Sequence, residues 1–145
     1  MTGNFWRMAV AGFVAGALSV LVFHQLGFHF AAELGYGRSN FYSLRPVPPW
    51  GVPTIVSQAF WGGLWGILGT FVVTRLPGVL NGALGWILFA ITLVLAVNWF
   101  VVLPLKGAPV GGGWRLPGIV VVPIVYALWG FGMWLFYTLA RKLLK

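Results

Sequence analysis

Four long apolar runs dominate the sequence. They cover about residues 5–30, 52–75, 79–103 and 118–142. Each run exceeds the roughly 20 residues that an α-helix needs to cross a hydrocarbon core about 30 Å thick. A transmembrane barrel would instead show many alternating segments of about 10 residues. The runs therefore predict an all-α integral membrane protein, a bundle of four transmembrane helices that forms a single membrane domain over residues 1–145.

The scarcity of charge supports lipid as the solvent for this chain. Only 7% of its residues are charged and 60% are hydrophobic, whereas a soluble domain carries roughly 25% charged residues. Nine Lys and Arg residues oppose one acid, Glu33, and they stand mostly singly at the ends of the apolar runs. This pattern is typical of membrane orientation and of contact with anionic headgroups, and not of nucleic-acid binding. We expect a lipid bilayer, and no nucleic acid, as a partner.

The residue inventory excludes most catalytic chemistry. There is no cysteine and only one carboxylate side chain, so thiolate metal sites, cysteine nucleophiles and carboxylate pairs are excluded. Ser57 and His24 could meet as nucleophile and base, but no glycine-flanked serine motif surrounds Ser57 and no carboxylate is available to orient the histidine. We therefore expect no enzyme activity, no catalytic residues and no metal site.

Two histidines in the first run raise the question of a haem. His24 and His29 are five residues apart, which places them about 140° apart around a helix. They cannot ligate one iron from the same helix, and a two-histidine haem would require a second subunit. We expect no cofactor.

The connections between the runs predict the topology. Leu76, Pro77 and Gly78 form a tight turn that should make the second and third helices antiparallel neighbours, whereas about residues 31–51 and 104–117 form longer connections. The expected fold is thus two helical hairpins. Ala59, Trp61, Gly62 and Thr70 recur 68 residues later as Ala127, Trp129, Gly130 and Thr138. The hairpins could be a parallel repeat, although this biased composition produces such matches by chance.

The distribution of cations predicts the orientation. With both termini in the cytoplasm, the cytoplasmic cations are Arg7, Arg75, Arg141, Lys142 and Lys145, and the outer ones are Arg38, Arg45, Lys106 and Arg115. The counts are nearly equal, but the clustered cationic tail resists translocation and favours this orientation. We expect a bacterial inner-membrane protein with both termini cytoplasmic.

Glycine pairs predict where helices pack closely. Gly12 and Gly16 form a GxxxG pair in the first run, and Gly62 and Gly66 form another in the second. In lipid, close backbone approach at small residues is a main source of helix association. The pattern predicts tight contacts, which could lie within one chain or between subunits.

Polar residues inside the runs are the candidate functional residues. At the expected topology each helix contributes a polar group about 8–12 Å below the outer boundary. The candidates for ligand binding or pore lining are His24, Gln25, Ser57, Gln58, Asn98 and Tyr126. They could line a polar cavity, or they could be a hydrogen-bonded network that holds the bundle together.

Two functions fit this layer. The first is a homo-oligomeric channel or transporter for a neutral or anionic solute, because four helices leave little room for a pore within one chain. The alternative is a non-catalytic accessory or assembly subunit of a larger membrane complex, or a protein that binds lipid or pigment.

Overall fold

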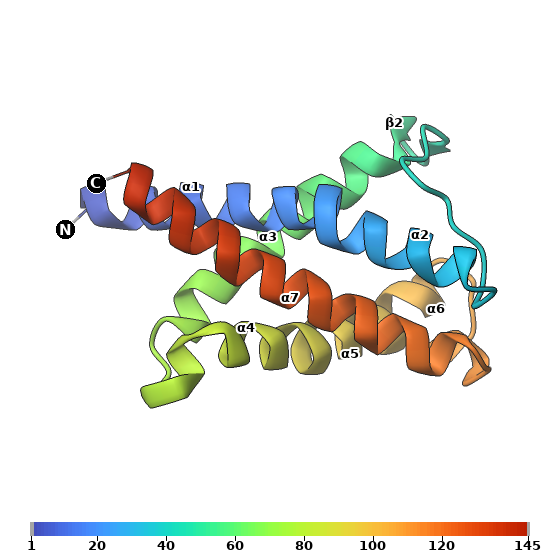
Figure 1. The fold of residues 1–145 in the computed structure, drawn as a ribbon. Coiled ribbons are helices and arrows are strands. Elements are labelled where there is room, and N and C mark those ends of the chain that lie inside the picture. Colours follow the sequence, from blue (N-terminus) through green and yellow to red (C-terminus); the bar gives the residue numbers. More distant parts are fainter. Residues whose placement is uncertain (1, 145) are drawn as a thin grey trace.

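The computed structural model describes residues 2–144 and contains four long helical spans, packed as a bundle (Figure 1). The spans are Asn4–Glu33, Thr54–Val73, Ala83–Leu105 and Gly118–Leu143. Each is long and apolar enough to cross a membrane, which confirms the predicted four-helix fold. The first span continues past the predicted end to Glu33, and the third begins four residues later than predicted.

The first and third spans contain π-helical turns, whereas the second and fourth are single α-helices. The first span comprises α1 (Thr2–Ser19), η1 (Val20–His24) and α2 (Gln25–Glu33). The second is α3 (Thr54–Val73) and the fourth is α7 (Gly118–Leu143). The third comprises α4 (Ala83–Phe89), η3 (Ala90–Val94), α5 (Leu95–Val97), η4 (Asn98–Val102) and α6 (Leu103–Leu105). Each π turn rotates the following residues relative to a regular α-helix.

The two ends of the bundle differ. We call the end at which α1 begins and α7 ends the termini side, and the opposite end the loop side (Figure 1). On the termini side, a connection containing the 3₁₀ turn η2 (Gly78–Asn81) joins α3 to α4. The loop side holds residues 34–53, with the strands β1 (Pro46–Val47) and β2 (Val52–Pro53), and residues 106–117, with the 3₁₀ turn η5 (Val110–Gly113). The two strands pair antiparallel.

The two glycine pairs face each other across the interface of α1 and α3. A Cβ atom added at Gly12 would lie 2.7 Å from the carbonyl oxygen of Gly66, and one added at Gly62 would lie 3.0 Å from that of Gly16. The backbones touch, and no side chain larger than hydrogen fits between them. The close contact that the sequence predicts thus lies within one chain.

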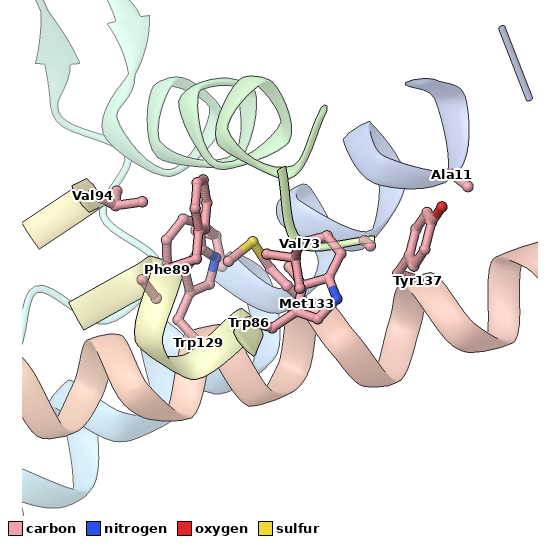
Figure 2. Packing of buried hydrophobic residues seen from close by; sticks show 11 residues of the cluster. Ala11, Val73, Trp86, Phe89, Val94, Trp129, Met133 and Tyr137 are labelled. Atoms are coloured by element: carbon pink, nitrogen blue, oxygen red, sulfur yellow. The ribbon is translucent and has the colours of Figure 1, made fainter. Parts of the chain in front are cut away.

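The last helix, α7, lies between α1 and the third span. The Ser19 hydroxyl donates to the Trp129 carbonyl at 2.6 Å, and the Trp129 indole donates to the Gly16 carbonyl at 3.3 Å. On its other side, a Cβ atom added at Gly130 would lie 2.7 Å from the Trp86 carbonyl oxygen. Buried apolar side chains from α3, α4, α7 and the first span fill the core between these helices (Figure 2).

In the part of the chain that the structure describes, the main contacts between the second and third spans lie near their connecting turn. Gly69 packs against Trp86 and Phe89 there, and the rings of Trp65 and Phe89 lie 6.3 Å apart. Toward the loop side the two spans diverge (Figure 1). The expectation that the tight turn makes them antiparallel neighbours therefore holds only at the termini side, because α7 and α1 fill the centre of the bundle. If the two hairpins were a two-fold repeat, the interface of the second and third spans would be equivalent to that of α1 and α7. The first lies near the connecting turn, whereas the second includes the hydrogen bonds of Ser19 and Trp129.

Candidate functional site

The first span divides the predicted polar layer into two parts. Gln25 and His24 are consecutive, so their side chains point about 100° apart around the helix. Gln25 is directed toward α3, where it meets Gln58, and His24 is directed toward α7, where it meets Tyr126. The layer is therefore not one cluster.

Gln25 and Gln58 form an amide pair between the first and second spans. The Gln25 Nε2 group donates to Gln58 Oε1 at 2.8 Å. Gln25 is 5% exposed, whereas Gln58 and its neighbour Ser57 are half-buried. A hydrogen bond between two side chains at membrane depth joins the helices directly, because neither amide can turn to water without leaving the other unpaired.

Tyr42, from the loop-side connection, closes over the amide pair. Its main-chain N–H donates to Gln25 Oε1 at 3.1 Å, and its side-chain hydroxyl donates to the Leu21 carbonyl at 2.5 Å. In a regular α-helix the Gln25 N–H would bond to that carbonyl. In the π turn η1 the Gln25 N–H instead contacts the carbonyls of Val20 and Val22, which leaves the Leu21 carbonyl available to an external donor.

The same connection also caps α3. The Arg45 carbonyl accepts from both the N–H and the hydroxyl of Thr54, at 2.9 and 2.8 Å. The Ser43 carbonyl accepts from the Ile55 N–H at 3.0 Å. Two N–H groups that α3 cannot satisfy internally therefore find partners in the loop. Residues 42–45 are tied both to the first span and to α3, so they form a fixed cover over the amide pair.

His24 lies in an aromatic setting on the other side of the first span. Its ring is 5.0 Å from that of Phe28 and 6.1 Å from that of Tyr126, measured between centroids. The Nδ1 atom of His24 is buried and has no hydrogen-bond partner among the described residues. Tyr126 packs in turn against Trp129, at 6.0 Å. This part of the layer is held together by ring packing.

Asn98 and Ser57 are not part of the hydrogen-bonded pair formed by Gln25 and Gln58. Asn98 is half-buried at the start of η4, on the third span. Within residues 2–144, no side-chain hydrogen bond joins Asn98 or Ser57 to another member of the layer. Depth alone therefore did not bring the six residues together.

Two hollows lie at opposite ends of the bundle. The loop-side hollow has a volume of about 530 Å³ and is lined by residues of α2 and its following loop, among them His29, Glu33, Asn40 and Phe41. The rings of His29 and Phe41 are stacked at 4.5 Å. The termini-side pocket has a volume of about 210 Å³. Neither is lined by the six predicted residues.

Sequence reasoning missed Tyr42, Leu21 and the termini-side pocket. The signal that could have pointed to Tyr42 is the aromatic segment from Tyr36 to Tyr42 in the connection between the first two spans. Within residues 2–144 there is no group of three or more His, Asp or Glu side chains that could hold a metal ion.

No family model, curated protein or solved structure matches the chain. The four spans identify it as a small polytopic membrane protein that resides in a lipid bilayer.

Proposed function

We propose that the chain is a non-catalytic accessory or assembly subunit of a larger membrane complex. The observation that carries this proposal is that polar groups within the spans bond to one another across helix interfaces. Gln25 donates to Gln58, and Ser19 donates to the Trp129 carbonyl. Such contacts hold helices together at about 0.6–2 kcal/mol each. They leave few donors and acceptors for a passing solute.

The packing of α1 against α3 supports the same proposal. A solute that crossed the bundle between these helices would have to separate Gly12 and Gly16 from Gly62 and Gly66, whose backbones are in contact. It would also have to break the amide pair and displace residues 42–45. A bundle that is closed in this way favours a rigid subunit that stabilises neighbouring proteins in the membrane. It does not favour a solute path within one chain.

Transport of a neutral or anionic solute through a homo-oligomer is the second candidate. It is favoured by the third span, where Asn98 is half-buried and unbonded to the rest of the layer. The second and third spans also diverge on the loop side (Figure 1). In this interpretation a path would run between copies of the chain, with Asn98 facing it.

We infer that the termini side faces the cytoplasm of a bacterial inner membrane. Among described residues the termini side carries Arg7, Arg75, Arg141 and Lys142, and the loop side carries Arg38, Arg45, Lys106 and Arg115. Lys145 lies outside the described residues. Adjacent cations at the end of α7 support this orientation, since clustered positive charge close to a span resists translocation.

Co-purification tests the accessory function. An affinity-tagged chain is extracted from its native membrane in mild detergent, and the proteins that accompany it are quantified against an untagged control. We expect a defined set of membrane proteins in fixed ratio to the chain, at a native mass well above that of its own oligomers. A lone, monodisperse homo-oligomer would contradict the accessory function and favour the second candidate.

A further inference from the structure

The termini-side pocket lies where three segments meet. It is formed by the last turns of α7, the end of α3 and the region from η2 to the start of α4. Its volume is about 210 Å³, and the residues that carry the argument below are Asn81, Trp86, Trp134, Tyr137, Arg141 and Lys142. This volume is below the roughly 300–1,000 Å³ of sites that enclose drug-sized ligands or cofactors.

The pocket is positively charged, and no acidic side chain is among the described residues that line it. Arg141 and Lys142 both line it, and the one acidic residue of the chain, Glu33, lies on the loop side. The Arg141 guanidinium is held over the Tyr137 ring, 5.7 Å from its centroid. Arg75 does not line the pocket. Its side chain donates a hydrogen bond to the Phe71 carbonyl, one turn earlier in the chain.

The two cationic side chains of the pocket can only donate hydrogen bonds. The hydroxyls of Thr74 and Thr138 also line it, but they donate to the carbonyls of Thr70 and Trp134 at 2.6 and 2.8 Å. The Tyr137 hydroxyl is buried and lies on the side of Ala11 (Figure 2). The charged and amide donors in the pocket are therefore Arg141, Lys142 and the exposed Asn81.

We propose that this pocket holds the phosphate group of an anionic phospholipid. Guanidinium, ammonium and amide donors together match the oxygens of a phosphate. The pocket lies at the ends of the membrane spans, which is the depth of lipid headgroups, and basic pockets between helices bind such headgroups. Trp86 and Trp134 form apolar walls. The neighbouring Val79 and Leu84 are 77% and 47% exposed, so they offer an apolar surface to acyl chains.

Lipid retention by the purified full-length chain tests the proposal. The chain is delipidated in detergent and titrated with phosphatidylglycerol or, separately, with phosphatidylcholine, and bound lipid is counted by native mass spectrometry. We expect wild type to bind phosphatidylglycerol more tightly, and Arg141→Gln/Lys142→Gln to weaken that binding about 10- to 30-fold, the factor expected from two cations near a membrane surface. Asn81→Leu should weaken it without any change in net charge.

The matched control removes two cations at the other end of the bundle. Arg38→Gln/Arg45→Gln lowers the net charge by the same amount and should leave the preference for phosphatidylglycerol intact. Equal losses in both double variants, or no loss in either, would overturn the proposal. Inorganic phosphate added as a competitor should displace little lipid, and displacement at equal concentration would contradict the lipid source. Thermal unfolding of each variant verifies that the bundle is still folded.

Discussion

The Gln25 side-chain amide donates to the Gln58 side-chain oxygen at 2.8 Å, across the interface of the first two spans. The same interface contains the facing glycine pairs one to four turns nearer the termini side. Close backbone contact and a side-chain hydrogen bond thus act on the same two helices. The Tyr42 main chain extends this network to the loop.

Loss of one amide should destabilise the bundle. Gln58→Leu leaves the buried Gln25 Nε2 group without its partner, and we expect a loss of about 1–2 kcal/mol in the free energy of unfolding. Reversible denaturation in mixed micelles measures it. The double variant Gln25→Leu/Gln58→Leu leaves neither amide unpaired, so its loss should be smaller than the sum of the two single losses. Additive losses would show that the pair is not coupled.

The glycine interface should not tolerate a methyl group. Gly16→Ala places a Cβ atom into the Gly62 carbonyl, so the helices must move apart, and we expect a loss of about 1–3 kcal/mol or more. Gly118→Ala is the matched control, because no atom outside the chain neighbours lies within 4 Å of its added Cβ. It should be neutral or slightly stabilising, since alanine is the better helix former. Comparable losses in both variants would contradict the described packing.

The Tyr42 hydroxyl should hold the loop-side connection in place. Tyr42→Phe removes its hydrogen bond to the Leu21 carbonyl and should lower local stability by about 0.5–1.5 kcal/mol. Hydrogen exchange of residues 40–45 should accelerate while that of the core of α7 stays unchanged. Tyr36→Phe, at a residue that is 57% exposed, serves as the control. Unchanged exchange in Tyr42→Phe would show that the hydroxyl does not fix the loop.

The orientation can be tested with single cysteines, because the natural chain has none. Asn40→Cys lies on the loop side and Asn81→Cys on the termini side, and both asparagines are exposed. In intact cells a membrane-impermeant maleimide should label Asn40→Cys, and it should label Asn81→Cys only after permeabilisation. The reverse pattern would place the termini outside.

The sequence was sufficient to predict the spans, because bilayer thickness sets their length and the hydrocarbon core requires their apolar content. It was also sufficient to predict close approach at Gly12, Gly16, Gly62 and Gly66. It could not predict that α1 and α7 would fill the centre of the bundle. Residue depth follows from position in a span, whereas direction around the helix depends on packing and on π turns such as η1. His24 and Gln25 therefore share a depth and face different helices.

The loop-side cover was beyond sequence reasoning for a similar reason. Tyr42 bonds to the Leu21 carbonyl, whose helical hydrogen bonding is changed by the π turn η1. The residue types in η1 do not predict a π turn. The divergence of the second and third spans was also not predictable, because a tight turn fixes only the helix ends that it joins. The loop-side cover and the divergence of the two spans both depend on how the helices pack in the assembled bundle.

We propose that the polar groups of the spans hold the bundle together and do not line a path through it. Solute flux into liposomes reconstituted with the purified chain tests this claim most directly, with a panel of neutral and anionic solutes. We predict flux equal to that of protein-free liposomes, for wild type and for Gln58→Leu and Asn98→Leu alike. Saturable flux of any solute by wild type, abolished in a folded Gln58→Leu or Asn98→Leu variant, would contradict the claim.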